Sequence, residues 1–112
     1  MIPTLYNALL RCTRTDDLAH PVFELTREDL GLWILELTFG FKDQASLEDG
    51  VKSVINRLSE HRALLKELAQ DSSDYTLHIT FSGNDTTRVI LPLLLLELAA
   101  SCGFQIEVYR FE

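Results

Sequence analysis

The sequence predicts an α+β domain, a two-layer open-faced sandwich formed by residues 1–112 as one unit. A chain of 112 residues has room for one hydrophobic core, because two smaller units would each bury too little surface to fold unaided. Several segments alternate apolar and polar residues, as half-buried strands do. A doubly covered parallel sheet would instead consist of apolar runs. We therefore expect a mostly antiparallel sheet of 4–5 strands with two main helical segments on one face.

The N-terminal third carries the first expected strands. Alternation over residues 5–12 predicts a strand, and residues 13–20 are polar and indicate a loop. A short extra strand is predicted at 22–25, and a turn at 27–31 leads into the strongest strand pattern, at 32–39. The inward side chains of the first strand are predicted to be Tyr6, Ala8, Leu10 and Cys12.

A helix is expected to begin at Ser46, whose hydroxyl can accept from the free backbone amides of the first turn. Glu48 and Asp49 then lie at the positive end of the helix dipole. Apolar residues recur at helical spacing from Leu47 to Leu68, and a polar interruption falls at 59–62. One bent helix and two shorter helices both fit this pattern.

The second half ends with a leucine-rich helix between two alternating strands. Residues 75–82 alternate strictly, and the turn at 83–85 predicts a short partner strand over 87–91. Pro92 and Gly103 suit the start and the end of the next helix. That helix is apolar almost all round, which predicts that it is well covered. A last alternating strand follows at 104–111.

The shared alternation predicts which side chains lie under the helices and which lie on the open face. The expected core residues are Trp33, Leu35, Leu37, Leu77, Ile79, Phe81, Ile106 and Val108. The opposite face, open to water or to a partner, is expected to carry Glu36, His78, Thr80, Glu107 and Tyr109.

The order of elements from about residue 31 to 110 resembles that of the domain of unknown function 4279 family. The resemblance lies in the strand at 33–35, the helical segment that ends near Leu68, the step from Leu91 into Pro92, and the close of the last helix on Ser101-Cys102-Gly103 before the final strand. It implies the α+β fold, and it implies a small bacterial domain of the kind that can serve as an immunity protein.

Cysteines and histidines show no pattern of a reactive or metal-binding site. Cys12 and Cys102 are far apart and are expected to be small buried hydrophobes. His20, His61 and His78 match no metal-ligand spacing. We therefore expect a non-catalytic protein without cofactor or metal. The absence of a signal-peptide pattern and of a membrane-length apolar run predicts a cytoplasmic protein that does not enter membranes.

Acidic residues are concentrated in residues 16–49, which hold nine acids against two bases and so account for the entire net charge of −7. This charge disfavours nucleic acid as a partner. It is expected either to serve solubility or to steer a basic partner protein. The candidate partner-binding residues are Asp16, Asp17, Glu24, Glu28, Asp29 and Glu36.

Two functions are consistent with these features. The leading hypothesis is an immunity or inhibitor protein that neutralises a basic toxin, of nuclease type for example, through its acidic surface. The alternative is a small-molecule-binding or self-associating module, in which the open sheet face forms a homodimer interface. The outward residues proposed for that interface are Leu32, Ile34, Tyr109 and Phe111.

Overall fold

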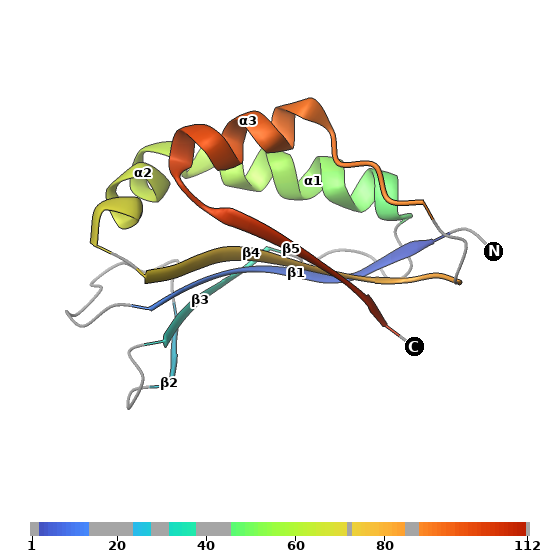
Figure 1. Cartoon of the computed structure of the whole chain (residues 1–112), viewed down its shortest axis with the longest axis horizontal. Helices are drawn as coiled ribbons and strands as arrows, with labels where there is room; N and C mark the ends of the chain where they lie inside the picture. The colour runs from blue at the N-terminus through green and yellow to red at the C-terminus, as the bar shows by residue number, and fades with distance from the viewer. Residues whose placement is uncertain are drawn as a thin grey trace.

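The fold is an α+β sandwich of two layers, as expected. A computed structural model describes residues 3–13, 24–27, 32–37, 46–71, 73–84 and 88–111. In these residues three helices cover one face of a five-stranded sheet (Figure 1). The strands are β1 (Thr4–Thr13), β2 (Glu24–Arg27), β3 (Leu32–Glu36), β4 (Ser73–Ser82) and β5 (Gln105–Phe111). The helices are α1 (Leu47–Glu60), α2 (Arg62–Asp71) and α3 (Leu93–Cys102).

The sheet has the strand order β2-β3-β1-β4-β5 and is mostly antiparallel. The exception is β5, which runs parallel to β4. Strands joined by a crossover helix can pair in parallel, whereas a tight turn can only give an antiparallel pair. Here α3 is that crossover helix, and it carries the chain from the end of β4 back to the beginning of β5 (Figure 1).

The prediction of a partner strand at 87–91 is wrong. Residues 88–92 pair with no strand in the described part of the chain, and Pro92 is the N-cap of α3, with φ −60° and ψ 145°. This segment climbs from the sheet layer to the helix layer, so its backbone cannot remain in the plane of the sheet. Val89 and Leu91 pack on the core along this path, and Ile90 points outward.

Tyr6 was predicted to point inward and instead is 58% exposed. The reason is a bulge in β1: Leu5 lies opposite Phe81, and Asn7 lies opposite Thr80, the next residue of β4. The extra residue, Tyr6, shifts the alternation by one position. As a result Leu5 joins the core, and Ala8, Leu10 and Cys12 keep their predicted inward places.

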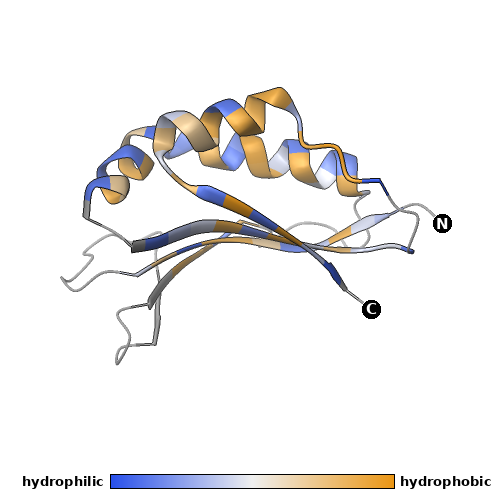
Figure 2. Ribbon diagram, viewed as in Figure 1, coloured by the Kyte–Doolittle hydropathy of each residue, from blue (hydrophilic) through white to orange (hydrophobic). Residues whose placement is uncertain are grey.

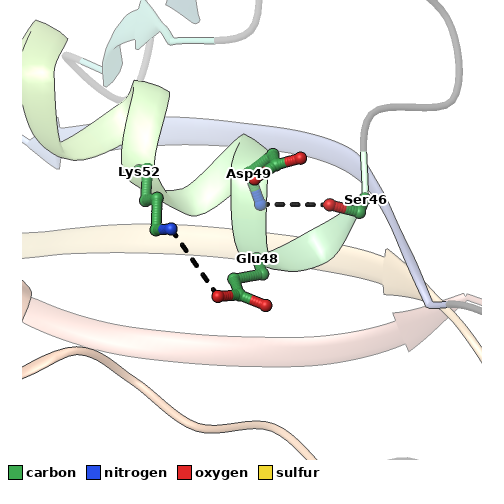
Figure 3. A network of polar contacts seen from close by, with 4 residues as sticks. All are labelled: Ser46, Glu48, Asp49 and Lys52. Atoms are coloured by element: carbon green, nitrogen blue, oxygen red, sulfur yellow. Dashed lines mark hydrogen bonds and ion pairs between the residues drawn. The ribbon is translucent and has the colours of Figure 1, made fainter.

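The polar interruption at 59–62 separates two helices. His61 is the C-cap of α1, and its backbone N–H donates to the carbonyl of Leu58 at 3.1 Å. The predicted start of α1 is confirmed, because the Ser46 hydroxyl accepts from the Asp49 amide at 3.2 Å (Figure 3). Gly103 ends α3 in the left-handed conformation, as its sequence position predicted.

The predicted core is largely confirmed. Leu35, Leu37, Leu77, Ile79 and Phe81 are buried. Ile106 and Val108 pack against the core but remain partly exposed, because β5 is an edge strand. The side chain of Trp33 lies outside the described part of the chain. Both cysteines are free thiols and are buried as expected.

The boundaries of two strands differ from the predicted ones. The described part of the extra strand predicted at 22–25 is Glu24–Arg27, which continues beyond the predicted end, while residues 22 and 23 lie outside the described ranges. β3 ends at Glu36, before the predicted end at 39. Leu37 already leaves the strand in a bend, although its N–H still donates to the carbonyl of Ala8 at 2.9 Å. Strand ends are weakly specified by pattern, since alternation continues beyond the last paired residue.

Candidate functional site

The outer side of α3 and the segment before it expose large apolar side chains. Leu95, Leu98, Ala99 and Cys102 face the sheet and are buried. The remaining leucines are exposed by 80% at Leu93, 49% at Leu94 and 43% at Leu96, and Ile90 is 77% exposed. We call these four exposed residues, Ile90, Leu93, Leu94 and Leu96, the leucine surface. In Figure 2 the helix and the segment before it are mostly orange, with blue and paler parts between.

The helix was predicted to be well covered, and this expectation is wrong. α3 contacts α1 and α2 with one side, and no described element lies over its other side. Single exposed leucines are ordinary, but a contiguous apolar patch on a small domain is typical of an interaction surface.

A pocket with a volume of about 360 Å³ borders the leucine surface. It lies between the first turns of α1 and the segment that leads into α3, and Ile90 belongs to both the pocket and the leucine surface. Most of its lining is apolar, with Leu47 and Val51 on one side and Val89, Leu91 and Pro92 on the other. Its size and character fit a bulky apolar group.

Three charged residues line the same pocket. Lys52 Nζ lies 3.6 Å from Glu48 Oε1 one helical turn away, and both side chains are well exposed (Figure 3). Such an exposed pair contributes little to stability. Arg88 lies across the pocket from α1. The pocket therefore carries mixed charge around an apolar floor, and it favours an apolar guest over a strongly charged one.

Polar side chains from three adjacent strands gather on the sheet face opposite the helices. Glu107 and Tyr109 of β5 lie beside His78 of β4, and Arg11 of β1 lies on the other side of His78. Glu107 Oε2 lies 3.4 Å from His78 Nδ1 and also accepts a hydrogen bond from the Tyr109 hydroxyl. We call Arg11, His78, Glu107 and Tyr109 the open-face cluster.

The open-face cluster shifts the protonation of two of its members. Burial and the positive charge of Arg11 lower the pKa of His78, and the Glu107 carboxylate opposes them in part. The hydrogen bond to Glu107 raises the pKa of Tyr109. At neutral pH the imidazole is therefore neutral and the phenol keeps its proton.

The six acidic candidate residues are only partly within the described part of the chain. Asp16, Asp17, Glu28 and Asp29 lie outside it. Glu24 lies in β2 opposite Ile34, which places its backbone beside β3, where Glu36 is exposed at the strand end. These two acids are thus on neighbouring strands at the β2 side of the sheet.

The described residues contain no group of three or more potential metal ligands. His61 caps α1, His78 belongs to the open-face cluster, and His20 lies outside the described ranges. Among those residues, no helix is long and apolar enough to cross a bilayer.

The sequence pattern predicts part of these sites. Alternation placed His78, Glu107 and Tyr109 on one face, but it gave no strand register and so missed Arg11. The leucine surface belongs to a leucine run, and in the sequence that run predicts a well-covered helix. The pocket is formed by segments about forty residues apart, and no local pattern predicts it.

Comparisons of this chain with protein-family models, curated proteins and solved structures find no match. The resemblance to the domain of unknown function 4279 family therefore remains a prediction from the order of elements.

Proposed function

We propose that this protein is a protein-binding domain whose partner docks on the leucine surface. The observation that carries the proposal is the exposure of four large apolar side chains, Ile90, Leu93, Leu94 and Leu96, within one stretch of seven residues. Leaving such a patch in water forgoes about 25 cal/mol for each Å² of apolar surface that a partner would cover. A partner protein that covers it gains this free energy.

The neighbouring pocket supplies the place for an anchor residue. In many interfaces a few large side chains, buried in pockets at the centre, provide most of the binding free energy. The pocket beside Ile90 has an apolar lining and a volume of about 360 Å³. We expect a bulky apolar side chain of the partner to enter it while the leucine surface contacts the surrounding residues.

The proposed partner is a basic protein, and the proposed role is inhibition of the immunity-protein type. The net charge of −7 opposes the approach of a second copy of this chain and favours a positively charged partner. A toxin that cleaves nucleic acid needs a basic active cleft, and an acidic protein can cover such a cleft. The pocket residues would contact the partner in the complex, and the acidic residues would attract the basic partner during its approach.

Replacing Leu93 and Leu94 together by serine is expected to weaken partner binding at least about 10-fold without unfolding the protein, since both side chains are exposed. The matched control is Lys66→Gln/Glu67→Gln, which changes two exposed residues of α2. We would purify the host proteins that the wild type and the control capture and that the serine variant does not. The Kd of each captured protein for the three forms of this chain would then be measured. Equal Kd values for all three forms would contradict the proposal.

Self-association is distinguished by light scattering of the purified protein alone. We expect a monomer at micromolar concentration. If the wild type is a dimer and the Leu93→Ser/Leu94→Ser variant is a monomer, the leucine surface binds a second copy of this chain and not the proposed partner. A dimer that survives this variant would favour the alternative interface on the open sheet face.

The acidic residues are expected to control the rate of association. Asp16→Asn/Asp17→Asn and Glu28→Gln/Asp29→Gln variants should associate more slowly with a basic partner, and wild-type association should slow as salt screens the charges. Stopped-flow kinetics at low and high salt would measure both effects. If neither variant slows association and salt has no influence, the acidic residues serve solubility only.

A further inference from the structure

The open-face cluster lies on three neighbouring strands, on the side of the sheet that the helices leave uncovered (Figure 1). His78 pairs in register with Glu107 of β5 and with Leu9 of β1. Arg11 is two residues beyond Leu9 and so lies diagonally beside His78 on the same face. The strand register thus brings a guanidinium, an imidazole and a carboxylate together.

The contacts within the open-face cluster fix the orientation of the imidazole ring. Nδ1 of His78 faces Glu107 Oε2 at 3.4 Å, and the His78 ring stacks on the Tyr109 ring with centroids 5.9 Å apart and planes 4° apart. A carboxylate beside one ring nitrogen holds the proton of a neutral imidazole on that nitrogen. We therefore assign the proton to Nδ1, which leaves Nε2 with a lone pair.

Two nitrogen atoms of the open-face cluster have no hydrogen-bond partner. His78 Nε2 and Arg11 Nε are both buried, and neither meets a donor or acceptor among the described residues. Buried polar atoms are nearly always satisfied by protein, water or a ligand. These two atoms lie on adjacent strands and on one sheet face, and we take them as the candidate contacts of a ligand.

The charge of the open-face cluster depends on the protonation of His78. The charged groups facing the imidazole are Arg11 on β1 and Glu107 on β5, with the neutral Tyr109 hydroxyl beside them. Glu36 lies one strand further, opposite Leu9. With neutral His78, the charges of Arg11 and Glu107 cancel. A proton on Nε2 makes the local charge positive and turns His78 Nε2 into a donor, beside Arg11 Nε, which is always a donor.

We propose that the open-face cluster binds a small oxyanion, a carboxylate or a tetrahedral dianion, between Arg11 and His78, and that binding takes up one proton. The proton comes from solvent and bonds to His78 Nε2, while Nδ1 keeps its own proton toward Glu107. The oxyanion then accepts hydrogen bonds from Arg11 Nε and from His78 Nε2. This site is independent of the leucine surface, which lies on the helix layer.

Titration with acetate and with sulfate tests the proposal, because neither ion changes its charge between pH 6 and 8. The His78 ring proton is followed by NMR, and sodium chloride at equal ionic strength is the control. We expect saturable binding that is about 10-fold or more tighter at pH 6 than at pH 8, and a higher midpoint of His78 titration with the ion present. If acetate alone binds, the site takes carboxylates; if sulfate alone binds, it takes tetrahedral anions.

Two charge-matched variants separate a site from general screening. Arg11→Gln removes a charge from the open-face cluster, and Lys66→Gln removes one from the exposed surface of α2. We expect Arg11→Gln to weaken binding at least about 10-fold and Lys66→Gln to leave it unchanged. Equal effects of the two variants, or shifts that chloride reproduces, would overturn the proposal. If Arg11→Gln does not fold, the pH dependence of wild-type binding still decides, because a site without proton uptake binds equally at both pH values.

Discussion

Replacement of Leu77 by alanine is expected to lower the free energy of unfolding by about 2–5 kcal/mol. Leu77 is fully buried in β4, where it lies between Leu10 of β1 and Ile106 of β5. The smaller side chain would leave a cavity that strands held on both sides cannot close. Urea denaturation followed by circular dichroism measures the loss, provided that the denaturant dependence is unchanged.

Thr80 provides the matched control on the same strand. It lies on the opposite face of β4 and is partly exposed, so Thr80→Ala should cost less than about 1 kcal/mol. Small and equal losses for both variants would mean that the inner face of β4 has been assigned wrongly. A large loss for Leu77→Ala alone would confirm it.

Replacement of Gly103 by alanine is expected to cost about 2–4 kcal/mol, for two separate reasons. Gly103 has φ +83°, a left-handed conformation that costs an alanine about 1–2 kcal/mol. An added Cβ would also lie 2.8 Å from the Cβ of Ala69 in α2, so the helices would have to move apart. Gly103 therefore permits both the end of α3 and its contact with α2.

A double-mutant cycle separates the two reasons. Ala69→Gly removes the atom that a Cβ at position 103 would meet, so Ala69→Gly/Gly103→Ala should lose about 1 kcal/mol less than the two single losses together. Thermal or urea unfolding of the four forms gives this coupling. If the stability losses of the two single variants simply add in the double variant, the whole cost of Gly103→Ala comes from backbone strain. Ser101→Ala, an exposed change in the same helix, should stay within about 0.5 kcal/mol.

The candidate sites differ in how far the sequence anticipated them. The side of the sheet that carries His78, Glu107 and Tyr109 was predictable, because alternation fixes the face of each residue in a strand. Their contacts with one another, and the place of Arg11, require the register between strands far apart in the chain. The leucine surface could not be predicted, since a run of leucines is consistent with either a covered or an uncovered helix.

The sequence by itself determined the local features: the strand faces of β3, β4 and β5, the start of α1 at Ser46 and the end of α3 at Gly103. Each depends on backbone geometry and hydrogen bonds within a few residues. Only the tertiary structure decided the bulge at Tyr6, the parallel pairing of β5 with β4, and the side of α3 that stays exposed. These features depend on which distant segments meet and how much surface they cover. Their free energies arise from contacts between elements, and no local pattern of residues contains them.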